Sequence, residues 1–132
     1  MYYLFFLLVS SFLLQILPQS LPQSPSEGAE ALWQCLGGSS ATCFYDLRSQ
    51  EVRAACDASD SGCVQAFTLT RNIIFLTRGI DAFQPGMYDM RIQETNETHA
   101  VVHVYVPAYT QWPIKLFFVQ EGGLWLNEYI QS

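Results

Sequence analysis

The sequence predicts an α+β fold in which N-terminal helices precede a four-stranded antiparallel meander sheet that packs on one long helix. Residues 87–130 alternate apolar and polar side chains, with turn residues between the runs, which is typical of strands. Residues 62–78 instead repeat apolar side chains at intervals of three and four, as an amphipathic helix does. A length of 132 residues accommodates a single domain.

The chain begins with a long apolar segment. Its first 26 residues contain no charged side chain, and the end of this stretch is rich in proline, serine and glutamine. This pattern predicts a signal peptide over residues 1–26, with cleavage after Ser26. Because the apolar run approaches the roughly 20 residues of a spanning helix, an uncleaved membrane anchor is the alternative. We therefore expect residues 27–132 to form the folded domain, either secreted or extracytoplasmic, or anchored to a membrane by this segment.

The four cysteines, Cys35, Cys43, Cys56 and Cys63, lie in one short block. An even number of cysteines in a small exported chain predicts two disulfides. Zinc ligands favour more closely spaced pairs, so no metal site is expected. Three pairings are open. We favour Cys35–Cys43 with Cys56–Cys63, because Gly37-Gly38 would interrupt the helix that a nested pairing requires.

The helical half is predicted from capping residues and apolar spacing. Three short helices are expected, over Glu27–Leu36, Ser40–Leu47 and Gln50–Cys56. Ser49 is the expected N-cap of the third, and the long helix should start after Ser59-Asp60-Ser61 and end at Gly79. The stripe of the long helix that we expect to face the sheet comprises Ala66, Leu69, Ile73, Leu76 and Ile80. Arg71 and Arg78 lie on another side of this helix and are interpreted as a solvated flank.

Four strands are predicted, over Met87–Thr95, Thr98–Val106, Pro113–Gln120 and Gly123–Ile130. Their side chains alternate between two faces of the sheet. One face is aliphatic and should meet the helices; a ligand pocket there would be lined by Tyr88, Met90, Val102, Val104, Leu116 and Leu126. The other face mixes aromatic and polar groups. It is either a sheet edge that curls over its own loops or a surface for a protein partner or homodimer, around Tyr105, Phe117, Trp125 and Tyr129.

Two polar motifs lie on the predicted sheet. Asn96-Glu97-Thr98 matches the N-glycosylation sequon at a hairpin tip, so Asn96 is a candidate glycosylation site if the chain is eukaryotic and secreted. His99 and His103 are about 13 Å apart at the usual strand rise, which is too far to share a metal ion. A His103–Asp89 pair across adjacent strands could transfer a proton, although an ordinary polar pair fits the same residues.

The closing hairpin resembles that of a known superfamily. Within residues 116–126, the turn Glu121-Gly122-Gly123 separates an apolar strand from a strand that contains Trp125. Together with the order of helices and strands over Ala31 to Ile130, this hairpin resembles the NTF2-like (cystatin-like α+β) superfamily. The resemblance implies helices packed against a curled sheet. Members similar to ketosteroid isomerase use a carboxylate or a histidine between helices and sheet, and the aliphatic face here offers neither.

Charge narrows the classes of function. Twelve acidic against six basic side chains give a net charge of −6, which argues against nucleic acid, because binding phosphates requires a basic patch. No cofactor is expected. The favoured hypothesis is a small exported binding or interaction domain without catalytic activity, acting through the aromatic-rich sheet face. The alternatives are an NTF2-like enzyme or small-ligand carrier with a pocket between helix and sheet, and a membrane-anchored accessory subunit. Contact with a membrane is expected only if the N-terminal segment is retained.

Overall fold

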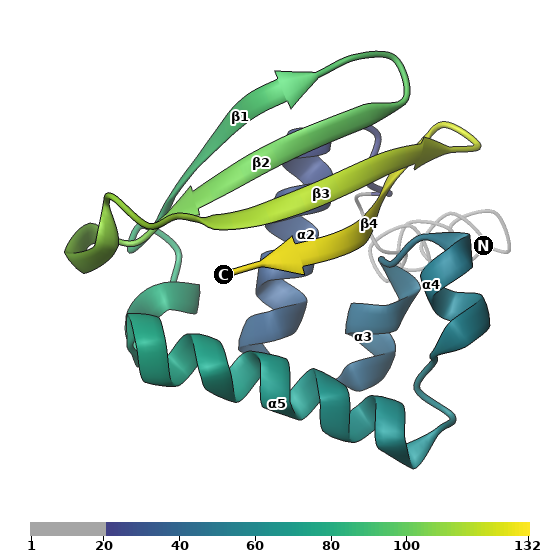
Figure 1. The fold of residues 1–132 in the computed structure, drawn as a ribbon, viewed down its shortest axis with the longest axis horizontal. Coiled ribbons are helices and arrows are strands. Elements are labelled where there is room, and N and C mark those ends of the chain that lie inside the picture. Colours follow the sequence, from purple (N-terminus) through teal and green to yellow (C-terminus); the bar gives the residue numbers. More distant parts are fainter. Residues whose placement is uncertain (1–20) are drawn as a thin grey trace, which may run out of the picture.

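A computed structural model describes residues 21–132 and confirms the α+β fold (Figure 1). The helices are α2 (Pro25–Gly37), α3 (Ala41–Asp46), α4 (Gln50–Ala55) and α5 (Ser61–Arg78). The strands are β1 (Asp89–Thr95), β2 (His99–Tyr105), β3 (Ile114–Glu121) and β4 (Leu124–Gln131). Two 3-10 turns connect them, η1 (Ile80–Phe83) before β1 and η2 (Pro107–Tyr109) before β3. Each predicted element is present within a few residues of its expected bounds.

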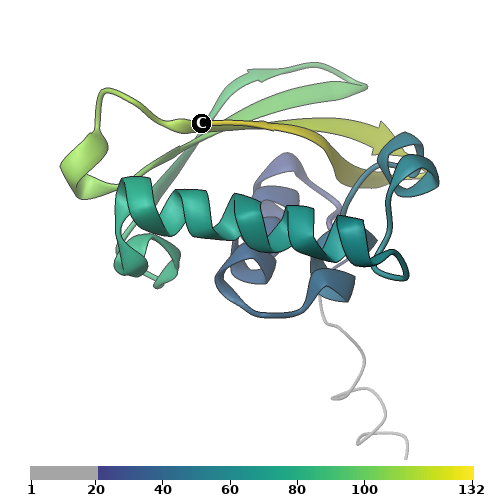
Figure 2. The same cartoon turned by 60° about the horizontal axis from the view of Figure 1, so that its bottom comes forward.

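The sheet is an antiparallel meander in the order β1-β2-β3-β4. The β3–β4 hairpin closes through Gly122 and Gly123, whose φ angles are 58° and 83°. Glycine adopts this left-handed conformation without a steric penalty, which explains the glycine pair in the turn. Helices α2, α3 and α5 lie on one side of the sheet, so its two faces have different surroundings (Figure 2).

Side-chain caps define where the helices begin. Ser24, Ser40 and Ser49 each accept a hydrogen bond from the backbone N–H three residues later, at 3.2 to 3.3 Å. The Asp60 carboxylate accepts two from the first turn of α5, at 2.7 and 3.2 Å. Gly79 ends α5 with a φ of 88°. The predicted roles of Ser49, Asp60 and Gly79 are therefore confirmed.

The core lies mainly between α2 and the inner face of the sheet. Helix α2 approaches all four strands closely. A glycine permits this approach, because a Cβ atom on Gly28 would lie 2.8 Å from the backbone oxygen of Trp125. The indole of Trp33 is fully buried and donates to the backbone oxygen of Ala82 at 2.7 Å. The other fully or almost fully buried apolar residues of this layer are Ala29, Leu32, Leu36, Ala100, Val102, Val104, Ile114, Leu116 and Phe118.

The apolar stripe predicted for the long helix faces solvent at the four positions whose side chains are described, so that prediction is wrong. Leu69, Ile73 and Leu76 are 61%, 41% and 85% exposed, and Ala66 is exposed as well. The side chain of Ile80 lies outside the described part of the chain. Another side of α5 faces inward instead. Its buried residues are Cys63, Phe67 and Ile74.

Contacts with α3 set this rotation of α5. The Phe67 ring packs 5.2 Å from the Phe44 ring, measured between centroids. The Tyr45 hydroxyl donates to the backbone oxygen of Cys63 at 2.7 Å. Cys63 is also joined to Cys56 by a disulfide, so two contacts hold the first turn of α5 and a third holds the next turn.

Two disulfides join cysteines that are consecutive in the sequence, and the favoured pairing is confirmed. Cys35–Cys43 connects α2 to α3, and Cys56–Cys63 connects the end of α4 to α5. Their Cα–Cα distances are 5.5 and 5.7 Å. Two disulfides in so small a domain indicate an oxidising, extracytoplasmic environment.

Strand β4 contains a β-bulge that its sequence alternation does not predict. Phe117 of β3 pairs with Tyr129, whereas the next residue, Phe118, pairs with Asn127. Glu128 is therefore one residue more than β3 can match. Because of it, the side chains of β4 before the bulge lie on the opposite faces from those that strict alternation, counted from Tyr129, would give.

The bulge corrects two predicted positions. Trp125 packs against the core side, near the start of α2, instead of on the outer face. Leu126 lies opposite Val119 on the outer face instead of on the inner one. Beyond the bulge, Tyr129 lies on the outer face, as predicted, and Ile130 lies on the inner face.

Asn127 lies next to the bulge, and its hydrogen bonds connect the helical half of the domain to the sheet. Its side-chain amide is fully buried and donates to the backbone oxygens of Phe117 and Tyr129, each at 3.0 Å. Its backbone N–H donates to the oxygen of Leu47 at 2.8 Å, and its backbone oxygen accepts from Ser49 at 2.7 Å. The segment 47–49 therefore continues the sheet beyond β4 for one residue pair.

The fold begins before the predicted boundary at Ser26. The backbone oxygen of Pro22 accepts a hydrogen bond from Trp125 at 2.7 Å, and Ser24 caps α2. A cut after Ser26 would fall in the first turn of α2. The rest of the predicted signal peptide, Met1–Ser20, lies outside the described residues. None of the helices within residues 21–132 is both long enough and apolar enough to cross a membrane.

Candidate functional site

A row of basic side chains crosses the outer face of the sheet. Arg91 on β1 lies opposite His103 on β2, which lies opposite Lys115 on β3. Gln131 on β4 completes the row. Side chains directly opposite one another have Cβ atoms about 4.5 to 5.5 Å apart. The basic side chains of Arg91, His103 and Lys115, here called the basic row, are thus neighbours. They lie side by side in a chain whose net charge is −6.

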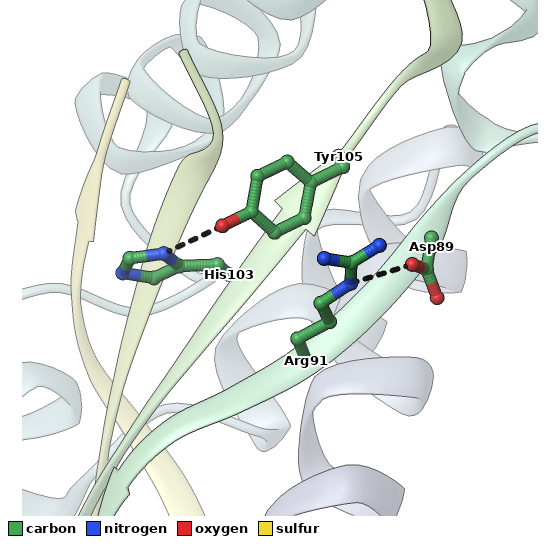
Figure 3. A network of polar contacts seen from close by, with 4 residues as sticks. All are labelled: Asp89, Arg91, His103 and Tyr105. Atoms are coloured by element: carbon green, nitrogen blue, oxygen red, sulfur yellow. Dashed lines mark hydrogen bonds and ion pairs between the residues drawn. The ribbon is translucent and has the colours of Figure 1, made fainter. Parts of the chain in front are cut away.

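Arg91 is the centre of the polar network in Figure 3. Its Nε donates to the Asp89 carboxylate at 2.8 Å, and its guanidinium carbon lies 5.0 Å from the centroid of the Tyr105 ring. The Tyr105 hydroxyl in turn lies 3.4 Å from Nδ1 of His103. The side chains of Arg91 and Asp89 are 63% and 60% exposed, so this ion pair contributes only about 0 to 1 kcal/mol. Both groups remain accessible to a partner.

The imidazole of His103 is held towards its neutral form. Burial lowers the pKa of His103, the Lys115 cation lowers it further, and Glu94 partly opposes them. The predicted His103–Asp89 pair is not formed, because Asp89 lies opposite Tyr105 and its carboxylate binds Arg91. The hypothesis of proton transfer between these two residues is therefore wrong.

Two hollows flank the basic row. One, of about 260 Å³, lies at the start of β1, and the other, of about 410 Å³, lies beside the β2–β3 loop. Tyr105 lines both of them, while His103, Lys115 and Trp112 line only the second. The Trp112 side chain is 70% exposed, and Arg78 steadies its loop by donating to the Trp112 backbone oxygen at 3.0 Å.

The aromatic surface predicted for a partner is formed in part. Phe117 and Tyr129 pack with their ring centroids 5.7 Å apart, and Tyr129 is 57% exposed. Tyr105 lies on the same face, beside the basic row. Trp125 does not belong to this surface, because the bulge places it on the core side, whereas Trp112 adds an exposed indole at the opposite end of the face.

The space predicted as a ligand pocket is filled by core side chains. Three of its expected lining residues are at most 1% exposed: Val102, Val104 and Leu116. Tyr88 and Met90 pack against the same core, and the Tyr88 hydroxyl donates to the Glu30 carboxylate. Burial raises the pKa of Tyr88, and the adjacent Glu30 raises it further. Leu126 lies on the other face of the sheet.

The glycosylation sequon lies in the β1–β2 turn. The Asn96 side-chain oxygen accepts from the backbone N–H groups of Thr98 and His99, each at 2.9 Å. Asn96 itself is exposed, so a glycan attached here would project into solvent.

The sequence reasoning did not identify Arg91, Lys115 or Trp112 as parts of one site. Strand alternation places the first two on the outer face, but only the pairing register shows that they flank His103. Within the part of the chain that is described, no three His, Cys, Asp or Glu side chains are grouped closely enough to hold a metal ion. Comparisons with protein-family models, with curated proteins and with solved structures each gave no match.

Proposed function

We propose that this chain is an exported binding domain whose outer sheet face holds an acidic segment of a partner protein. The basic row of Arg91, His103 and Lys115 is the observation that carries this proposal. A partner carboxylate placed over the row would pair with Lys115 and with Arg91, whose exposed ion pair with Asp89 is weak, and it would favour the charged form of His103. Because the whole chain has a net charge of −6, an acidic segment would be repelled by most of its surface and attracted to this row.

The surroundings of the basic row favour a protein partner. Tyr105, Phe117 and Tyr129 offer aromatic area next to it, and Trp112 adds an exposed indole at its edge. Aromatic residues and arginine are enriched at the centres of protein interfaces, where they supply most of the binding energy. The proposal assigns no catalytic step to this face.

Export, signal cleavage and glycosylation are part of the same proposal. Intact mass spectrometry of the protein from its native host should show loss of the N-terminal segment, two disulfides and extra mass at Asn96. Because Pro22 and Ser24 contribute hydrogen bonds to the fold, we expect the mature N-terminus to lie before Pro22. A full-length mass would instead support the alternative of a membrane-anchored accessory subunit.

A random peptide library displayed on phage tests the binding proposal directly. Peptides selected on the folded domain should be enriched in Asp and Glu and should compete with one another. Their binding should fall about tenfold or more for Lys115→Glu, since a repulsive charge replaces an attractive one. Arg53→Glu is the matched control, because it makes the same change of charge at an exposed position on α4.

Comparing Lys115→Glu with Arg53→Glu separates the effect of a charge in the basic row from the effect of the net charge of the chain. Equal losses for Lys115→Glu and Arg53→Glu would show that only net charge matters and would overturn the assignment of the surface. Selected peptides without acidic residues, or peptides that bind Lys115→Glu undiminished, would overturn the proposed partner chemistry.

A further inference from the structure

Arg48 is a half-buried cation without an anionic partner among residues 21–132. Its Nε atom is shielded from solvent and has no hydrogen-bond acceptor, and no ion pair among residues 21–132 involves it. The guanidinium carbon lies 4.8 Å from the centroid of the Phe44 ring. Burial lowers the pKa of Arg48, and the only charge interaction that offsets this comes from Tyr45. Shielding a cation from water without a partner costs free energy, and pairing with an anion would recover part of that cost.

The backbone holds Arg48 at the junction of the two halves of the fold. Residue 48 pairs with Asn127 beside β4, and its N–H donates to the Tyr45 oxygen at 3.1 Å. The Arg48 side chain lines a space that side chains of α5 and of the end of β4 also line.

Arg48 lines a hollow of about 300 Å³ in this space. That volume is at the lower end of the roughly 300 to 1,000 Å³ of small-molecule sites. The walls are mainly apolar, formed by Ile73 and Ile74 of α5 and Ile130 of β4. Thr70 also lines the hollow, but its hydroxyl donates to the Ala66 backbone oxygen at 2.9 Å. Tyr129 and Ser132, near the end of β4, complete the lining. Arg48 is therefore the one cationic side chain among the residues that line the hollow.

Apolar surface continues beyond the rim of the hollow. Ile73 lines it and is also 41% exposed on the solvent side of α5. Leu69 and Leu76, four residues before and three residues after Ile73, lie on the same solvent-facing stripe. An alkyl chain longer than the hollow would therefore leave it over apolar side chains.

We propose that this hollow binds a small amphipathic monocarboxylate, whose carboxylate pairs with Arg48 and whose alkyl chain contacts Ile73, Ile74 and Ile130. One guanidinium matches one carboxylate, with two parallel N–H···O bonds. A phosphate dianion would retain an uncompensated charge against three isoleucines, which disfavours it. This site lies at the β4 edge of the sheet, beside α5, and Ser132 is the one lining residue that it shares with the hollow beside the basic row.

Octanoate and 1-octanol are suitable probes, because they share an alkyl chain and differ in the head group. Titrations of the folded domain would be followed by NMR and by isothermal calorimetry. Octanoate should perturb the amides of Thr70, Ile73 and Ile130 and should bind about tenfold or more tighter than octanol. Arg48→Met should remove that preference. This variant should also fold, since no carboxylate is left unpaired when the guanidinium is removed.

Two further variants keep the test decisive. Arg53→Met removes an exposed arginine from α4 and should leave the preference for octanoate unchanged. Ile73→Trp, at a partly exposed helix position, should weaken both probes by filling the hollow. Equal affinity for the two probes, amide shifts confined to other parts of the molecule, or an unchanged preference in Arg48→Met would each overturn the proposal.

Discussion

Replacing Asn127 should destabilise the domain far more than its single amide suggests. The side chain is fully buried, and its nitrogen donates to the backbone oxygens of Phe117 and Tyr129 at the bulge. In Asn127→Ala both oxygens would be buried without this donor. Each such group costs about 1 to 3 kcal/mol, and water entering the vacated space would lower the total. We therefore expect a loss of about 2 to 4 kcal/mol.

Urea unfolding, monitored by tryptophan fluorescence, measures this loss. Trp33 is fully buried, so its emission should report on the global transition. A decrease of about 2 to 4 kcal/mol is a large share of the roughly 5 to 15 kcal/mol that stabilises a domain. The matched control is Asn72→Ala on the exposed side of α5, which should change stability by about 0.5 kcal/mol or less. A loss below about 1 kcal/mol in Asn127→Ala would refute the assigned role of the amide.

The stability of Asn127→Asp should depend on pH, and the structure predicts the direction of that dependence. The carboxylate has the same shape but turns two donors into acceptors that face carbonyl oxygens. Burial should raise the pKa of this carboxyl above its value in the unfolded chain. The folded state then binds more protons, so the deficit relative to the native protein should be largest at neutral pH and should shrink on acidification. A deficit that is independent of pH would contradict the buried position.

Three further predictions concern other parts of the fold. Gly28→Ala should lower stability by about 1 to 2 kcal/mol in thermal unfolding, because overpacking outweighs the gain in helix propensity; increased stability would mean that α2 can move away from β4. Replacing Cys56 and Cys63 together by Ala should cost about 2 to 3 kcal/mol, as expected for a short ring, and an unchanged urea midpoint would contradict this. His103 should titrate below about 6.5 in NMR, and Lys115→Gln should raise its pKa. A lowered or unchanged His103 pKa in that variant would show that the two side chains do not interact.

Helix ends were predictable because their determinants are local. Ser49, Asp60 and Gly79 each act within three or four residues of their own position, so the sequence carries the full signal. The turn at Gly122-Gly123 is local in the same sense.

The rotation of α5 could not be predicted, because two of its faces have apolar residues at helical spacing. Contacts with Phe44 and Tyr45 favour the face with Phe67, and the other stripe remains exposed. The bulge in β4 likewise depends on Leu47 and Ser49, which are remote in sequence from Asn127. An asparagine within an apolar strand was the one local sign of irregularity.

The outer face was predicted where alternation alone decides it, as for Tyr105 and Phe117. The composition of the basic row required more, since Arg91 and Lys115 meet His103 only through the register of two separate hairpins. That register is set partly by a second bulge, between Ile92 and Glu94. The alternation within a single strand thus could not predict which residues of neighbouring strands face each other.

The order of the two disulfides has a consequence for how the protein can mature. A chain that crosses a membrane from its N-terminus presents its cysteines one at a time, and here the native partner of Cys35 and of Cys56 is the next cysteine to emerge. Oxidation in order of appearance therefore yields the native connectivity without reshuffling. In a chain exported in this direction, both rings could close within residues 35–63 before any strand of the sheet had left the channel. The sheet would then form on a helical half that is already cross-linked.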